Sequence, residues 1–150
     1  MIRKAQIDEF LHSQNIAVVG VSRNPKKFGF LIYQALLDKG YNCFPINPNM
    51  DSLNEKTCFK DLLSLPDEID ACVIVTGKPN TDLVLNQAIE KGVTKIWVQQ
   101  TSETPYVKEI SKSSDRNIIY GKCILMFLEP ITGAHKFHRF IVKLFGKLPK

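Results

Sequence analysis

Five short apolar segments alternate along the chain with stretches that have helical periodicity. The apolar segments are rich in β-branched residues and cover residues 16–20, 41–47, 70–76, 95–99 and 117–120. Continuous apolar runs of this length are typical of strands that are buried on both faces of a parallel sheet. Right-handed helical crossovers connect strands of this kind. The sequence therefore predicts a Rossmann-like, doubly wound α/β fold, in which a five-stranded parallel sheet carries helices on both faces.

The expected helices have recognisable ends. Apolar residues recur at helical spacing over residues 30–37, and Gly40 and Gly92 stand where helices commonly end in a left-handed glycine. Asn80 or Thr81 can cap the helix that precedes Gly92. We expect these and the remaining helices over residues 3–13, 58–65, 80–92 and 104–114. No repeat or linker interrupts the pattern, so residues 1–150 are expected to form a single domain.

The positive charge is concentrated in the C-terminal tail. From Ala134 onward there are five cations and no acid, which accounts for the whole net charge of +5. The rest of the chain is formally neutral, and this disfavours nucleic-acid binding by the domain as a whole. A basic amphipathic helix is predicted over about 133–146, because an apolar stripe is formed by Phe137, Phe140, Ile141, Leu144, Phe145 and Leu148. Either this helix docks against the sheet edge or a partner subunit, or it binds acidic lipid or nucleic acid.

The cysteines and the N-terminal residues indicate in which cellular compartment the protein is expected. No apolar run approaches the roughly 18 residues that a membrane span needs, and the charged N-terminus lacks the apolar core of a secretory signal. The four cysteines are widely separated and form no C-x-x-C pair; they are Cys43, Cys58, Cys72 and Cys123. Cysteines in this pattern are typical of reduced, buried thiols, so we expect a cytoplasmic protein without a transmembrane segment.

The stretch IAVVGVSRNPKKFG, residues 16–29, has the features of a phosphate-binding loop. Gly20 allows a sharp turn after the first strand, and the Ser22 hydroxyl and nearby backbone N–H groups can donate to phosphate oxygens. Gly29 stands at the start of the next helix, whose N-terminal dipole favours an anion. The loop also contains three cations and no acid: Arg23, Lys26 and Lys27. These cations either contribute to an anion site or form only a solvated loop surface.

The ends of the other strands have a similar character. In doubly wound sheets, ligands bind beyond the carboxyl ends of the strands, near the point where the strand order reverses. The segments that follow the second, third and fourth strands are small, polar or cationic, and they cover residues 47–49, 76–79 and 99–102. The sequence therefore predicts an anion-binding rim without acidic residues.

Two features disfavour NAD as the ligand. The dinucleotide fingerprint G-x-G-x-x-G requires a middle glycine, which this loop lacks. It also requires an Asp or Glu at the end of the second strand to bind the ribose, and the segment FPINPN offers no carboxylate there. NADP stays open as the alternative, in a small oxidoreductase or redox sensor, because cations are available for its extra phosphate.

Several longer segments resemble a known family. They are VGVSRNPKKFG, DKGYNCFPINPN, DACVIVTGKPN, GVTKIWVQQ and IIYGKCILMFLEP, which together span roughly Asn15 to Pro130. In these segments the chain is similar to the small stand-alone CoA-binding domain proteins and to the CoA-binding domain of succinyl-CoA synthetase alpha chains. The resemblance implies a Rossmann-like domain that binds coenzyme A across the strand ends. The several phosphates of CoA suit a rim that is rich in cations.

The resemblance also implies which residues meet CoA. The first loop would contact the ADP diphosphate through Gly20, Val21, Ser22 and Arg23. A stretch that is more variable in the family follows, with Lys26, Lys27, Phe28 and Gly29. Asn47 and Pro48 would border the nucleotide, and the adenosine or pantetheine would lie against Val75, Thr76, Gly77 and Lys78. Gln99, in the W-x-Q segment, completes the predicted CoA-binding set.

No constellation in the sequence indicates catalysis or a metal site. None of the three histidines, His12, His135 and His138, follows a strand. Cys123 does follow a strand, and either it reacts, as a mixed disulfide with CoA or as an oxidation sensor, or it packs as a small apolar residue. The prediction is a module that binds CoA or acyl-CoA as a carrier or regulator without catalytic residues. Its expected partner through the C-terminal helix is a second copy or a CoA-dependent enzyme.

Overall fold

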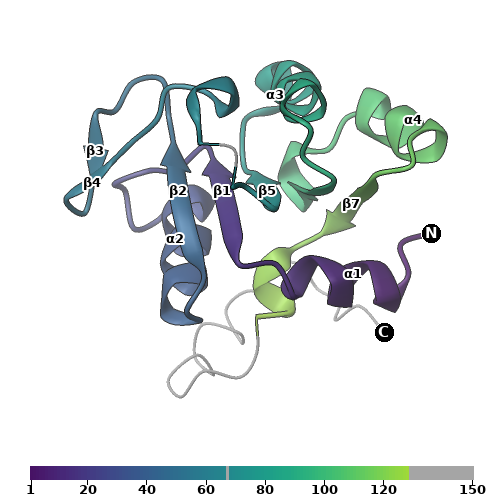
Figure 1. Ribbon diagram of the computed structural model, residues 1–150, viewed down its shortest axis with the longest axis horizontal. Coiled ribbons are helices and arrows are strands. Elements are labelled where there is room, and N and C mark those ends of the chain that lie inside the picture. Colours follow the sequence, from purple (N-terminus) through teal and green to yellow (C-terminus); the bar gives the residue numbers. More distant parts are fainter. Residues whose placement is uncertain (67, 129–150) are drawn as a thin grey trace.

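A five-stranded parallel sheet forms the centre of the molecule. The computed structural model describes residues 1–66 and 68–128. The strands of the sheet are β1 (Asn15–Val19), β2 (Asn42–Ile46), β5 (Ala71–Ile74), β6 (Lys95–Gln99) and β7 (Asn117–Lys122). Their order is β2-β1-β5-β6-β7, so the order reverses between β1 and β5 (Figure 1). The predicted Rossmann-like α/β fold with five parallel strands is confirmed.

The interior strands β1 and β5 are buried on both faces, as their continuous apolar runs predict. Ala17 of β1 lies opposite Phe44 of β2 on one side and Cys72 of β5 on the other. Every residue of β5 is buried, and so is β1 from Ile16 to Val19. Alternate residues of these strands therefore face different helical layers, which is why polar residues are excluded from both faces.

Helices cover both faces of the sheet (Figure 1). They are α1 (Lys4–Leu11), α2 (Phe28–Asp38), α3 (Lys78–Lys91) and α4 (Pro105–Ser113). Helices α1 and α2 pack on one face, and α3 and α4 pack on the other. Gly40 and Gly92 follow α2 and α3 with φ of +95° and +86°, so both predicted glycine stops are confirmed.

Helix α1 is fixed to the sheet through an aromatic cluster. The rings of Phe10 and of Trp97 in β6 form a T-shaped pair with a centroid distance of 5.4 Å and an interplanar angle of 71°. Phe127, which follows the short helical turn η3 (Ile124–Met126), lies 5.6 Å from the same indole. The indole nitrogen of Trp97 donates to the carbonyl of Lys122 at 3.1 Å, so this buried ring has its polar atom satisfied.

The predicted helix over residues 58–65 is wrong. Residues 58–65 instead contain the bridge of Phe59 to the end of β2 and the single helical turn η1 (Leu62–Ser64). A two-stranded ribbon, β3 (Ser52–Leu53) with β4 (Lys56–Thr57), precedes them. Asn54 and Glu55 form the tight turn of the ribbon with positive φ values of 50° and 67°. Phe59 then pairs with the end of β2, because its N–H donates to Pro45 and its carbonyl accepts from Asn47. Pairing with the sheet outweighs the weak helical pattern of this segment.

Helix α3 begins earlier than the predicted cap at Asn80 or Thr81. Its N-cap is Gly77, and Pro79 stands in the first turn, where its missing N–H costs nothing. Thr81 is fully buried, and its hydroxyl contacts the hydroxyl of Thr76 at 2.9 Å. The predicted C-terminal helix over 133–146 lies outside the described residues. Within residues 1–66 and 68–128, no helix is long and apolar enough to span a bilayer.

Candidate functional site

A pocket of about 690 Å³ lies beyond the carboxyl ends of β1, β2 and β5. This is the place where the strand order reverses, and doubly wound folds bind their ligands there. The volume is in the range of small-molecule and cofactor sites. Its walls come from the loops after these strands, from Lys60 and Asp61 just before η1, and from α3. The pocket is therefore the candidate binding site.

Two glycines let the first loop lie close to its neighbours. Gly20 has φ of +100°, and a Cβ at this position would lie 2.6 Å from the carbonyl oxygen of Val75. A Cβ on Gly29 would overlap the carbonyl oxygen of Gly20. The loop is also tied to β2, because the N–H groups of Gly20 and Val21 both donate to the carbonyl of Ile46. The glycines thus bring the start of α2 against the floor of the pocket.

Asn47 joins the loops that follow β1 and β2. Its side-chain amide donates to the carbonyl of Val21 at 2.8 Å, and its side-chain oxygen accepts from the N–H of Asn49 at 2.8 Å. Both the nitrogen and the oxygen of the Asn47 side-chain amide therefore hold the loops of the pocket in place. The residue lines the pocket as well, so it shapes the wall that a ligand would meet.

The segment between Ser22 and Lys27 is folded by its own side chains. The Ser22 hydroxyl accepts from the N–H of Asn24, and the Asn24 side chain accepts from the N–H of Lys26, each at 3.0 Å. Such local bonds are typical of turns that precede a helix. Ser22 and Lys27 line the pocket, whereas Lys26 does not.

Two helices begin at the pocket wall. Lys27 is the N-cap of α2 and Gly77 is the N-cap of α3, and neither caps its helix with a side-chain hydrogen bond. Helix N-termini present N–H groups and a positive dipole end, so they attract anions. The sequence of the first loop predicts one such terminus, and the structure adds a second at the same pocket.

The wall also contains a lysine that the sequence analysis missed. Lys60 lines the pocket, and its ammonium donates to the carbonyl of Met50 at 3.1 Å and to Asp51 at 2.8 Å. Hydrogen bonding to Lys60 lowers the pKa of the Asp51 carboxyl. No sequence signal indicated Lys60, because it reaches the pocket only through the pairing of Phe59 with β2.

One face of α3 forms the less polar side of the pocket. The lining residues of this helix are Asn80, Leu83, Val84 and Gln87. Their spacing is that of a single helix face, and this was a signal that the sequence analysis did not use. Leu83 is 61% exposed, which is unusual for a large aliphatic side chain. The pocket thus combines an anion-attracting side with an uncharged, partly apolar side.

A family model describing the CoA binding domain matches residues 14–129. The chain belongs to the CoA binding domain family. The matched residues include every described residue that lines the pocket.

The curated relatives include much longer proteins. An ADP-forming acetate–CoA ligase of Methanocaldococcus jannaschii is 29% identical over 130 residues, which are 81% of this chain and 18% of the ligase. An ADP-forming acetate–CoA ligase II of Archaeoglobus fulgidus is 31% identical over 87 residues, which are 57% of this chain and 13% of the ligase. The chain therefore spans less than a fifth of either ligase.

Other relatives have a similar length to this chain. The uncharacterized protein YneT of Bacillus subtilis is 28% identical over 122 residues, which cover 81% of this chain and 90% of YneT. A solved structure of a conserved hypothetical protein from Pyrococcus furiosus superposes with a TM-score of 0.70 at 32% identity, covering 74% of this chain and 96% of that one. A hypothetical protein from Pyrococcus horikoshii has a TM-score of 0.75 at 24% identity, which shows the fold alone.

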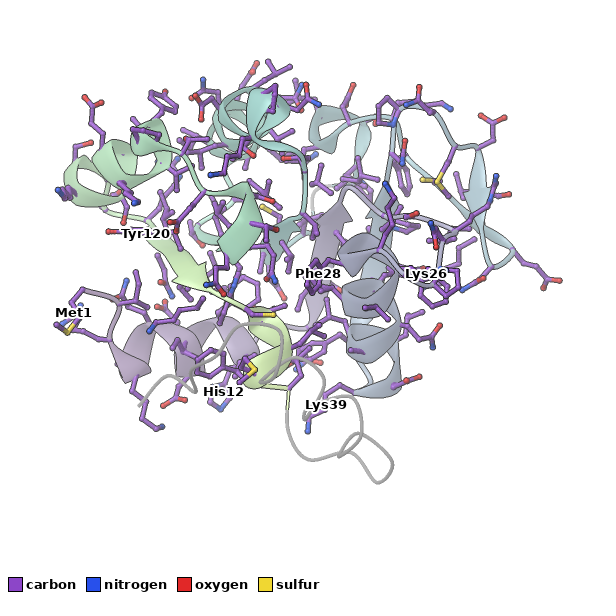
Figure 2. All side chains as sticks on the ribbon, turned by 180° about the vertical axis from the view of Figure 1, so that it is seen from behind. Met1, His12, Lys26, Phe28, Lys39 and Tyr120 are labelled. Atoms are coloured by element: carbon purple, nitrogen blue, oxygen red, sulfur yellow. The ribbon has the colours of Figure 1, made fainter. Side chains whose placement is uncertain are left out.

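The structure brings most of the predicted CoA-binding residues of this chain to one pocket. Nine of them line it: Gly20, Val21, Ser22, Lys27, Asn47, Pro48, Val75, Thr76 and Gly77. The other six do not: Arg23, Lys26, Phe28, Gly29, Lys78 and Gln99. Figure 2 shows Lys26 and Phe28 near the start of α2, with Lys39 at the opposite end of that helix.

Two of the six residues that do not line the pocket form hydrogen bonds elsewhere. The Arg23 guanidinium donates to the carbonyl of Ser52 at 2.8 Å and so reaches toward the ribbon rather than into the pocket. Gln99 is completely buried; its amide contacts the sulfur of Cys123 at 3.0 Å and accepts from the N–H of Ile124 at 3.1 Å. Gln99 therefore does not reach the pocket, because its strand places the side chain in the core.

The prediction of a rim without acids is wrong at one position. Asp61 lines the pocket, at the start of η1 rather than at a strand end. One carboxylate oxygen of Asp61 accepts from the N–H of Ser64 at 2.9 Å, so it caps this turn.

Cys123 packs inside the protein. It is only 3% exposed, and burial raises the pKa of its thiol, although the hydrogen bond from Gln99 opposes this shift. All four cysteines are buried and unpaired.

Within the described residues there is no group of three metal-ligating side chains. The described histidine, His12, is exposed, and its Nδ1 lies 2.6 Å from the carbonyl oxygen of Asp8.

Proposed function

We propose that this chain binds coenzyme A, free or as an acyl-CoA, in the pocket beyond β1, β2 and β5, and that it acts as a carrier or regulator without catalysis of its own. The observation that carries this proposal is the convergence of two helix N-termini, Lys27 and Lys60 on one side of a pocket whose other side, along α3, is uncharged and includes Leu83 and Val84. CoA has this division, since its phosphates are anionic and its pantetheine arm is largely uncharged. Membership of the CoA binding domain family supports the same ligand.

The geometry supports a particular orientation of the ligand. The diphosphate would lie against the loop at Gly20 and Ser22, where the N-terminus of α2 and Lys27 favour negative charge. The 3′-phosphate would lie toward Lys60. The uncharged part of CoA would pack along α3 at Leu83 and Val84.

The absence of catalysis is proposed because the pocket offers no nucleophile paired with a base. Ser22 and Thr76 are the hydroxyl residues of its wall, and the described histidine and the four cysteines lie elsewhere. The match to the ADP-forming acetate–CoA ligases supports a CoA-dependent enzyme as the partner that receives CoA from this chain or supplies it. The four unpaired cysteines support the reducing environment of the cytoplasm as its location.

Calorimetric titration tests the ligand. The protein is titrated with CoA, acetyl-CoA, ADP and NADP under the same conditions, and CoA and acetyl-CoA are expected to bind more tightly than ADP and NADP. Binding of NADP with no heat from CoA would overturn the proposal. Incubation with acetyl-CoA, followed by measurement of the free thiol released, tests the absence of catalysis. Release of CoA at a rate above the protein-free control would contradict it.

A further inference from the structure

A second cavity, of about 300 Å³, is lined by residues of α1, by Lys122 at the end of β7 and by Phe127. Helix α1 and the segment that follows β7 lie side by side in Figure 1. The apolar wall of the cavity is formed by Ile2, Ile7 and Leu11 on one side and by Phe127 on the other. Among the described residues, none that lines this groove also lines the CoA pocket. The groove is therefore a separate feature of the surface, and the proposed function does not use it.

The groove is built on a fixed framework. Phe10 anchors α1 on Trp97, and Phe127 packs on the same indole. The side chain of Asn117 at the start of β7 donates to the carbonyl of Gln6 at 2.8 Å and to the Glu9 carboxylate at 2.9 Å. Because both walls rest on the same buried ring, the groove has a defined shape before anything occupies it.

We infer that the C-terminal tail, residues 129–150, packs its apolar stripe into this groove. The described chain stops at Leu128, next to Phe127 of the groove wall, so the tail begins at the groove. Residues 129–136 can span roughly 25 Å when extended, enough to place Phe137 anywhere along α1. The stripe consists of Phe137, Phe140, Ile141, Leu144, Phe145 and Leu148 and needs an apolar surface to cover it.

The charges of the groove indicate that the stripe, and not the cations of the tail, makes the contact. The polar lining residues are Lys4, Asp8 and Lys122. Asp8 is the acid among the described lining residues, and it is already paired with Lys4 at 2.5 Å, so these residues offer no unpaired acid to a basic segment. An acidic partner or a lipid surface would use the cations of the tail, whereas packing in the groove leaves them in solvent.

The family match supports the pairing of these two segments. It covers residues 14–129, so α1 at one end and the tail from residue 130 onward at the other both lie outside it. A helix outside the family match forms one wall of the groove, and the second segment outside the match begins at the opposite wall. Each segment alone would leave an apolar face uncovered, and together they bury it.

Hydrogen exchange of the full-length chain tests the inference. Phe140→Asp with Leu144→Asp places two charges on the stripe, and exchange of the amides of α1 is expected to accelerate by about tenfold or more. The matched control, Arg139→Asp with Lys143→Asp, introduces the same side chains on the polar face with a larger change of charge. It should leave exchange in α1 unchanged. Unchanged exchange at β1 and β5 in both variants shows that the domain is still folded.

A reciprocal change and two conditions separate this contact from its alternatives. Leu11→Asp should accelerate exchange in the stripe of the tail by a similar factor, and 0.5 M NaCl should leave the protection of the wild-type protein unchanged because the contact is apolar. Equal exchange of α1 in the stripe variant and the wild type would overturn the inference. Protection that rises with protein concentration would also overturn it, since the occupant would then be the tail of a second copy.

Discussion

Gly29 at the start of α2 packs directly on the backbone of Gly20 in the loop after β1. A side-chain carbon on Gly29 would overlap the Gly20 carbonyl oxygen, and one on Gly20 would lie 2.6 Å from the Val75 carbonyl oxygen. Three backbone segments therefore meet without any side chain between them. The helix N-terminus comes close to the pocket only because of this contact, so the glycines act through packing as well as through backbone freedom.

Replacement of Gly29 by Ala is expected to lower the free energy of unfolding by about 1–3 kcal/mol, the usual cost of overpacking. It should also weaken CoA binding, because the start of α2 moves away from the pocket. Urea denaturation and calorimetry measure the two effects. The control is Gly77→Ala, where φ is −61° and the new Cβ meets nothing closer than 3.8 Å, so the loss of stability should be smaller. Equal losses in both variants would refute the packing role.

Lys60 is expected to contribute more to CoA affinity than Arg23. Lys60 lines the pocket, whereas Arg23 is bonded to Ser52 outside it. Lys60→Met should raise the dissociation constant of CoA by roughly tenfold or more, which corresponds to a charged hydrogen bond of about 1.5–3 kcal/mol. Arg23→Met should have a smaller effect, and Lys112→Met, on the exposed face of α4, should have none. A larger effect at Arg23 than at Lys60 would contradict this order.

Asp70 gives the stability a dependence on acid pH. Its carboxylate accepts hydrogen bonds from the N–H groups of Gln14 and Asn15, and these lower its pKa from the ordinary 3.8. Because the folded pKa is depressed, the stabilisation is complete above pH 3.8 and is lost as the pH falls through the folded pKa. Asp70→Asn should cost less than about 1 kcal/mol at pH 7, since the group is partly exposed.

The difference in unfolding free energy between the wild type and Asp70→Asn should therefore become smaller in acid. Urea denaturation at pH 7 and at pH 2.5 measures it. A difference that persists unchanged at pH 2.5 would show that the carboxylate charge is not the cause.

The buried thiols are expected to be unreactive until the protein unfolds. Burial raises the pKa of Cys43 and of Cys72 to about 12, from the ordinary 9.0, so almost no thiolate exists at neutral pH. Ellman's reagent at pH 8 should react slowly with the folded protein, and all four thiols should react in 6 M guanidinium chloride. Fast reaction of Cys123 in the folded state would instead support the redox role.

The raised pKa values of these thiols predict that the protein becomes less stable in alkali. Their folded pKa values are raised, so the neutral thiol is favoured in the folded protein. This contribution is complete below pH 9 and is lost as the pH rises toward 12. The denaturation midpoint should fall above pH 9, and replacement of Cys43 by Ala should reduce that fall. A midpoint that is constant from pH 8 to pH 10.5 would contradict the prediction.

The extent to which the sequence predicted the site differs from residue to residue. Gly20, Asn47 and Gly77 could be placed at the pocket because each follows a strand, and the ends of parallel strands meet at one edge of the sheet. Gln99 also ends a strand, but its side chain points into the core toward Cys123. The alternation of side chains along β6 decides this, and the sequence of a strand buried on both faces does not reveal which face a residue occupies.

Local patterns along the chain were enough to predict the five strands, the helices on both faces and the glycine stops at Gly40 and Gly92, because apolar periodicity and backbone freedom depend on near neighbours. The approach of Lys60 to the pocket, the turn of Arg23 toward Ser52 and the α3 wall at Leu83 were decided by the tertiary structure. These positions depend on segments far apart in the chain that pair or pack only after folding. Phe59 adding to the end of β2 is the clearest case, since one backbone pairing carries the neighbouring lysine to the ligand site.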